Sequence, residues 1–160
     1  MQCSNLIALI RVISNNSCNK ISIMNIAIIN GPNLNLLGTR EPAIYGNKTF
    51  EMYFEELKTT FPSVTFHYFQ SNVEGELINE IQRIGFAFDG IILNPGGYTH
   101  TSVALGDAIA SITTPVVEVH ISNIFGREEF RKLSHISAKA KGVISGLGLK
   151  GYALAVSYFQ

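Results

Sequence analysis

The sequence of 160 residues predicts an α/β fold in which helices cover both faces of a doubly wound, five-stranded parallel sheet. Two observations support this fold class. From Met24 onward, short apolar runs alternate with stretches whose apolar residues recur at helical spacing. Runs such as NIAII at 25–29 are also continuously apolar, which is typical of parallel strands buried on both faces.

Turn and capping residues set the boundaries of the expected elements. Pro62 ends the first helix and Gly85 the second, and Thr101 is the expected N-cap of the third. The expected strands cover residues 25–29, 64–69, 90–93, 115–119 and 142–145. The expected helices cover residues 48–61, 73–85, 101–111 and 149–159, with a helical turn at 128–133.

Right-handed crossover connections favour the flavodoxin-like strand order 2-1-3-4-5 for such a chain. In these sheets the ligand crevice lies outside the carboxyl ends of the strands, near the point where the strand order reverses. Strands 1, 3 and 4 are neighbours in this order. We therefore expect the loops that follow them to meet in one cleft.

Composition narrows the class of protein. Apolar residues make up 46% of the chain, which is enough for a core, and the length indicates one domain. Lys and Arg total 12, as do Asp and Glu, and no basic tract indicates nucleic acid or a membrane surface. No stretch is long and apolar enough to span a membrane. Zero net charge favours self-association, because little long-range repulsion opposes it.

The segment before Met24 reads differently from the rest. It lacks the positive start and cleavage site of a signal peptide, so we interpret residues 1–23 as a poorly ordered extension, or one that is not translated, before a single domain at 24–160. Both cysteines, Cys3 and Cys18, lie in this extension. The domain therefore has no disulfide framework, thiolate nucleophile or cysteine-ligated zinc, which fits a reducing, cytoplasmic location.

Strand 4 ends in a pair of ionisable residues. Glu118 and His120 are two positions apart, so they face the same side of a strand, roughly 6–7 Å apart by rise. A carboxylate beside an imidazole can orient it and raise its pKa, which suits general acid catalysis. The alternative is a structural pair at an exposed strand end.

Strand 3 is followed by NPGGYTHTS at 94–102. Gly96 and Gly97 allow a tight turn or a close approach to the backbone. The free N–H groups of the next helix attract anions, so a carboxylate ligand is expected there, near His100. Ordinary loop and capping chemistry is the alternative.

The loop after strand 1 carries Arg40 and Tyr45. The pKa of an unperturbed tyrosine is about 10, so few phenols are ionised at neutral pH. An adjacent guanidinium stabilises the phenolate, and lowering the pKa by two to three units takes about 3–4 kcal/mol. A lid-like loop could supply this pairing on closure. The alternative is a surface arginine and a half-buried tyrosine in a long connector.

Three other functions compete. A metal hydrolase could use His100, Asp107, Glu118 and His120, but no close ligand spacing occurs. A nucleotide- or flavin-binding module would be expected to carry a GxxxxGK[ST] loop or a GxGxxG fingerprint, and neither is present. A non-enzymatic assembly subunit would leave the polar strand ends unexplained.

From Met24 to Gln160 the chain resembles the type II 3-dehydroquinate dehydratases in several long motifs, which are NGPNLNLLGTREPAIYG, QSNVEGELI, LNPGGYTHTSVALGDAI, EVHISN and REEFR. The resemblance implies a flavodoxin-like hydro-lyase of the shikimate pathway. Its members eliminate water from 3-dehydroquinate in a reversible anti reaction through an enolate, giving 3-dehydroshikimate. The resemblance also implies that no metal and no cofactor takes part.

The resemblance implies residue roles as well. Tyr45 is the expected base, as tyrosinate, and Arg40 depresses its pKa. His120 is the expected general acid, oriented by Glu118, and Asn33 holds the water that stabilises the enolate oxygen. The residues expected to bind the substrate are Asn94, His100, Ile121, Ser122, Arg131 and, from a neighbouring subunit of a homododecamer, Asp107.

Overall fold

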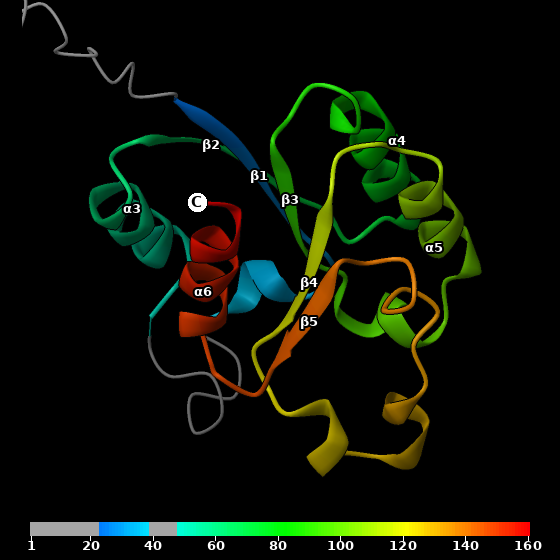
Figure 1. Ribbon diagram of the computed structural model, residues 1–160. Helices are drawn as coiled ribbons and strands as arrows, with labels where there is room; N and C mark the ends of the chain where they lie inside the picture. Colours follow the sequence, from blue (N-terminus) through cyan, green and yellow to red (C-terminus); the bar gives the residue numbers. More distant parts are fainter. Residues whose placement is uncertain (1–22, 39–47) are drawn as a thin grey trace, which may run out of the picture.

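The computed structural model describes residues 23–38 and 48–160 (Figure 1). Arg40, Tyr45 and all but the last residue of the expected extension lie outside these ranges. The described residues form a five-stranded sheet whose neighbouring strands are all parallel, in the order β2-β1-β3-β4-β5. The predicted fold class and strand order are therefore confirmed. The strands are Met24–Asn30 (β1), Val64–Gln70 (β2), Gly90–Asn94 (β3), Val116–His120 (β4) and Gly142–Ser145 (β5).

Helices cover both faces of the sheet, with α3 and α6 on one side and α4 and α5 on the other (Figure 1). Among the described residues, every helix is too short or too polar to cross a membrane. The α-helices are Phe50–Thr60 (α3), Glu74–Ile84 (α4), Val103–Ala110 (α5) and Lys150–Phe159 (α6). Short 3₁₀ helices form at Leu34–Leu36 (η1), Gly96–His100 (η2), Ile124–Gly126 (η3) and Glu129–Lys132 (η4).

The start of α5 corrects one expectation. Thr101 is not the N-cap, because its backbone N–H donates to the carbonyl of Tyr98 at 3.2 Å and closes the 3₁₀ helix η2. The cap is Ser102, whose Oγ accepts a hydrogen bond from the backbone N–H of Leu105 at 2.9 Å. The expected helix at 101–111 is therefore shorter, and the loop before it is more ordered than its glycines indicated.

Alternation along β1 divides the core into two layers. Ile26 and Ile28 face α3 and α6, whereas Ala27 and Ile29 face α4 and α5, and all four are fully buried. Burying an isoleucine side chain contributes roughly 1.5–3 kcal/mol, so the two layers together fix the strand in register. The strand ends that carry the polar residues are thereby held at one edge of the sheet.

The ends of β1 and β3 meet closely at the point where the strand order reverses. Asn30 and Asn94 are directly paired in the parallel register, and the N–H of Gly31 donates to the carbonyl of Asn94 at 2.8 Å. A Cβ atom on Gly31 would lie 2.6 Å from the carbonyl oxygen of Pro95. Only glycine permits this approach, which keeps the two loops together.

Candidate active site

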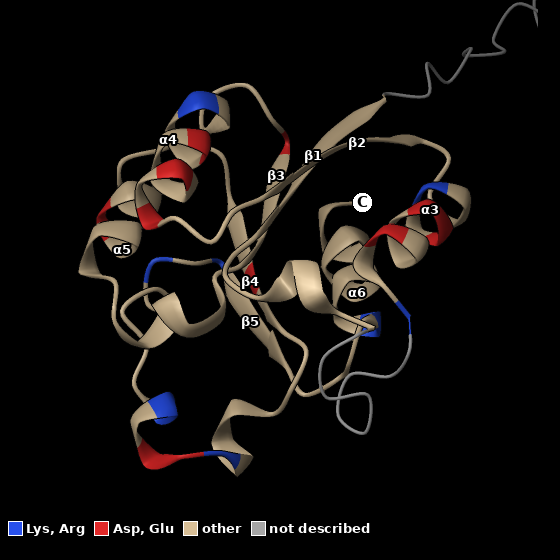
Figure 2. Cartoon of the chain, turned by 180° about the vertical axis from the view of Figure 1, so that it is seen from behind, with Lys and Arg blue, Asp and Glu red and all other residues tan. Residues whose placement is uncertain are grey.

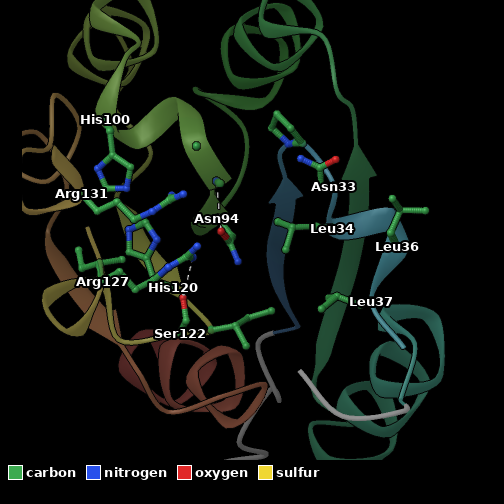
Figure 3. Close-up of a pocket in the computed structure, with 15 residues that line it drawn as sticks. Asn33, Leu34, Leu36, Leu37, Asn94, His100, His120, Ser122, Arg127 and Arg131 are labelled. Carbon is green, nitrogen blue, oxygen red and sulfur yellow. Dashed lines mark hydrogen bonds between the residues drawn. The ribbon is translucent and has the colours of Figure 1, made fainter. Parts of the chain in front are cut away.

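A cleft of about 830 Å³, counting its open mouth, lies at the carboxyl edge of the sheet, where the loops after β1, β3 and β4 meet (Figure 3). Its place is the one predicted from the strand order. The lining includes seven of the residues that the sequence singled out, which are Asn33, Asn94, His100, His120, Ile121, Ser122 and Arg131.

The cleft has one polar and one apolar wall. Histidine, arginine and asparagine side chains line the wall formed by the loops after β3 and β4 (Figure 3). Leu34, Leu36 and Leu37 in and after η1 line the opposite wall. The sequence analysis assigned no role to these leucines. They suit the carbon skeleton of a ligand whose polar groups face the other wall.

Glu118 and His120 form a buried pair at the end of β4. The Nε2 atom of His120 donates to Oε1 of Glu118 at 2.8 Å. Glu118 is completely buried and His120 is 5% exposed. The strand end is therefore buried, not exposed as the alternative of a structural pair assumed, because Thr99 of η2 and Ser137 of the segment before β5 both contact Glu118. Figure 2 shows the acidic position of β4 inside the molecule, whereas other acidic positions lie on the outer helices α3 and α4.

Three donors from the described part of the chain surround the Glu118 carboxylate. Besides His120, the hydroxyl of Thr99 donates to Oε1 at 3.2 Å and the hydroxyl of Ser137 donates to Oε2 at 2.5 Å. Burial alone would raise the pKa of Glu118, but the hydrogen bonds from His120 and Ser137 outweigh it and leave the pKa below its ordinary value. Glu118 is therefore an anion at neutral pH. Thr99 and Ser137 could not be predicted in this role from the sequence, because their contacts depend on tertiary packing.

The carboxylate fixes the tautomer of His120. Because Nε2 donates to Glu118, Nδ1 is the ring atom left for a reacting group in the cleft. The ring of His100 is stacked at 6.4 Å from that of His120, and His100 Nδ1 donates to the carbonyl of Leu133 at 2.7 Å. The two imidazoles thus lie side by side on the polar wall, each held through one nitrogen.

Two arginines at the rim give the cleft a positive character. Arg131 Nε donates to the Glu128 carboxylate at 2.7 Å, and Arg127 Nη1 donates to the hydroxyl of Ser122 at 3.4 Å. Two hydrogen bonds lower the pKa of Glu128, first the one with its own backbone N–H and then the one with the Arg131 guanidinium. Glu128 is therefore charged and holds Arg131 in place through an ion pair. Arg127 was not predicted as a site residue. Its spacing of four from Arg131 in REEFR is the signal that could have revealed it.

Asn33 occupies the turn between β1 and η1 in the left-handed region, with φ 66°. Asparagine tolerates this conformation better than most residues. Its backbone N–H donates to the side chain of Asn72, which follows β2, at 2.9 Å. The loop that brings Asn33 to the cleft is therefore anchored to the neighbouring strand end.

Four expected site residues are not among the lining residues of the cleft: Glu118, which reaches the lining through its hydrogen bond to His120, and three others. Arg40 and Tyr45 lie outside the described residues. Asp107 is on the exposed side of α5 and does not belong to the cleft lining. The described residues also contain no group of three or more His, Cys, Asp and Glu side chains that could hold a metal ion. The ligand types proposed for a metal hydrolase are thus not gathered into one such group.

Fold and site together define a doubly wound α/β protein with an acid–base pair in a cationic cleft at the carboxyl edge of its sheet. The sequence profile described as Dehydroquinase class II matches residues 24–160. A 3-dehydroquinate dehydratase of Prochlorococcus marinus (strain MIT 9301) is 51% identical over 136 residues, covering 84% of this chain and 92% of the relative. A catabolic 3-dehydroquinase of Verticillium alfalfae is 50% identical over 135 residues, covering 83% and 90%.

The crystal structure of the type II dehydroquinase from Butyrivibrio crossotus is similar as well. It superposes with a TM-score of 0.82 at 46% identity, covering 86% of this chain and 98% of that one. The chain belongs to the class II dehydroquinase family, the type II 3-dehydroquinate dehydratases, which are enzymes of the shikimate pathway. The resemblance noted in the sequence is therefore confirmed.

Proposed function

We propose that this protein catalyses the reversible anti elimination of water from 3-dehydroquinate, which gives 3-dehydroshikimate through an enolate. One observation carries the proposal: the buried pair of Glu118 and His120 faces a cleft with two arginines on its rim, in a chain of this family. Elimination next to a ketone needs a base for the carbon-bound proton and an acid for the departing hydroxyl.

His120 is the proposed acid. Nδ1 of its imidazolium protonates the hydroxyl as the carbon–oxygen bond breaks, and water leaves. Glu118 stays ionised throughout, because its three donors hold its pKa below the ordinary value. The carboxylate therefore orients the ring and stabilises the positive charge that the ring carries before proton transfer.

Tyr45, as tyrosinate, is the proposed base, and Arg40 is proposed to lower its pKa. The NGPNLNLLGTREPAIYG motif, which contains both residues and resembles the family, supports these two roles. The enolate that results carries negative charge on oxygen and needs donors already in place. We assign that role to a water held by Asn33, whose loop is anchored at the cleft.

The remaining polar residues are proposed to bind the substrate, which carries a carboxylate and several hydroxyls. Among the described residues, the cleft lining contains Arg127 and Arg131 and no carboxylate, so it suits an anion. Arg131, His100 and Asn94, with the backbone and hydroxyl at Ile121 and Ser122, supply the donors. The apolar wall of leucines packs against the carbon ring.

Adding 3-dehydroquinate to the purified protein and following the absorbance of the conjugated enone tests this function. Because a positioned acid or base contributes about 10²–10⁴-fold, Tyr45→Phe and Arg40→Ala are each expected to lower turnover by at least about 100-fold. Tyr158→Phe is the matched control, since Tyr158 is exposed on α6, and it leaves turnover unchanged. Unchanged turnover in both loop variants, or none in the wild-type protein, would overturn the proposal.

The proposal involves no metal and no cofactor. Full activity after exhaustive chelation is therefore expected, and a loss restored by one added metal ion would favour the metal hydrolase instead. Among His100, Asp107, Glu118 and His120, the four residues that such an enzyme could use, a hydrogen bond joins Glu118 to His120.

We also propose a homododecamer in the cytoplasm. Zero formal net charge and the family resemblance support the assembly, in which Asp107 would reach the site of a neighbouring subunit. The absence of cysteine from residues 24–160 supports a reducing compartment. Measuring the mass in solution tests the assembly, and a stable monomer with full activity would contradict the role of Asp107.

A further inference from the structure

We infer that Tyr152 is a positioning residue, which fixes the orientation of the Asn94 carboxamide beneath the substrate. This inference rests on the proposed function, in which Asn94 contacts the substrate. Tyr152 lies in the first turn of α6, away from the cleft lining, and is completely buried. It touches no reacting atom, so any effect on the reaction passes through Asn94.

The hydroxyl of Tyr152 joins the ends of two strands. It donates to Oδ1 of Asn30 at 2.8 Å and accepts a hydrogen bond from Nδ2 of Asn94 at 2.8 Å. Asn30 and Asn94 are direct partners in the register of β1 and β3. The three side chains thus form a short chain of hydrogen bonds under the floor of the cleft, at the point where the strand order reverses.

The available hydrogens give this chain of hydrogen bonds one direction. A tyrosine hydroxyl has a single hydrogen, and the carbonyl oxygen of Asn30 takes it. The Tyr152 oxygen can then only accept, so it faces the amino group of Asn94. On its other side, Oδ1 of Asn94 accepts from the backbone N–H of Gly96 at 3.3 Å.

A flipped Asn94 amide would lose both of these hydrogen bonds. Its oxygen would face the Tyr152 oxygen, whose hydrogen is already committed, and its amino group would face the N–H of Gly96. Asn94 is 3% exposed, so water does not compensate for the loss. The same amide lines the cleft, and its orientation decides which substrate groups it can donate to or accept from.

The surroundings keep the hydroxyl protonated. Burial is the largest cause that raises the pKa of Tyr152 above its ordinary value, and it outweighs the hydrogen bond accepted from Asn94 and the one donated to Asn30. The donor to Asn30 is therefore present at neutral pH.

Tyr53 provides a matched control. Its ring packs 6.3 Å from that of Tyr152 in the same layer, and its buried hydroxyl is not a partner in the hydrogen bonds that join Tyr152, Asn30 and Asn94. Tyr53→Phe and Tyr152→Phe each remove one hydroxyl from this layer. Only the second change cuts the link to Asn94.

Steady-state kinetics on the full-length enzyme tests the inference. Tyr152→Phe is expected to raise KM about tenfold, the loss of roughly one well-placed hydrogen bond, while kcat stays within about threefold. Tyr53→Phe leaves both constants unchanged. Combining Tyr152→Phe with Asn94→Ala gives the same KM as Asn94→Ala alone, because both changes act through one group. Additive effects, an unchanged KM in Tyr152→Phe, or an equal effect of Tyr53→Phe would each overturn the inference.

A second measurement does not depend on turnover. In protein labelled at asparagine, the side-chain amide resonances of Asn94 are expected to shift in Tyr152→Phe and to stay in place in Tyr53→Phe. Unmoved resonances refute the positioning role, whereas a wild-type protein without dehydratase activity refutes only the proposed function. Should Tyr152→Phe fail to fold, Asn30→Ala removes the acceptor that orients the hydroxyl and is expected to shift the same resonances.

Discussion

Replacing Ser137 by alanine removes one of the three donors that hold Glu118 ionised. The lost bond joins the serine hydroxyl to Oε2 of the carboxylate at 2.5 Å. Hydrogen bonds to charged groups contribute about 1.5–3 kcal/mol, and because Ser137 is only partly buried we expect about 1.5 kcal/mol of destabilisation at neutral pH. For a domain of this size that corresponds to a fall in Tm of roughly 3–6 °C.

The effect has a defined pH dependence. The pKa of Glu118 is lower in the folded protein than in the unfolded chain, where a glutamate titrates near about 4.3. Its stabilising contribution is therefore complete above that value and is lost as the pH falls through the lower, folded pKa. The difference in Tm between Ser137→Ala and wild type should thus be full at neutral pH and shrink at pH values below about 4.

Thermal unfolding of both proteins across this pH range measures the difference. Ser157→Ala is the control, because the hydroxyl of Ser157 donates to the neutral carbonyl of Ala153 on the exposed side of α6. Its small effect should not depend on pH. A gap for Ser137→Ala that stays constant with pH, or that is absent at neutral pH, would refute the view that this hydroxyl stabilises a charged carboxylate.

Two further predictions concern catalysis and binding. His120→Asn should lower kcat by about 10²–10⁴-fold with little change in KM, since it removes the acid, and an unchanged kcat in the enone assay would exclude His120 from that role. Arg131→Ala should raise KM at least about tenfold through the loss of a charge-assisted hydrogen bond. Lys132 pairs with Glu129 instead, so Lys132→Ala should leave KM unchanged. Equal KM values for the two variants would argue against substrate binding by Arg131.

The strand order and the place of the cleft could be predicted from the sequence, because alternating strands and helices with right-handed crossovers favour this order, and the order places the cleft. Continuous apolar runs mark strands buried on both faces, and β1, β3 and β4 each end in polar residues at the same edge. Side-chain alternation along a strand likewise predicted that Glu118 and His120 share one face, and the structure joins them by a hydrogen bond. The ends of most elements were shifted by one or two residues, and at the start of α5 the reason is that two capping residues, Thr101 and Ser102, are adjacent.

The residues that sequence reasoning missed depend on distant packing. Ser137 reaches Glu118 across 19 positions, and Tyr152 reaches Asn30 across 122. No local pattern encodes such a contact, since a serine in a loop and a tyrosine in an apolar helix are ordinary in both settings. The leucine wall after β1 was missed for a similar reason, because apolar residues in a loop show no periodicity that assigns them to a cleft.

The close approach of Gly31 to Pro95 limits how this site can be altered. Any side chain at position 31 would clash with Pro95 and push the loop after β1 away from the loop after β3. These two loops carry residues on opposite walls of the cleft. Attempts to change ligand preference should therefore keep Gly31 and vary the leucines that follow it in the cleft wall. Replacing one apolar side chain there by another changes the shape of the wall and leaves the contact between Gly31 and Pro95 intact.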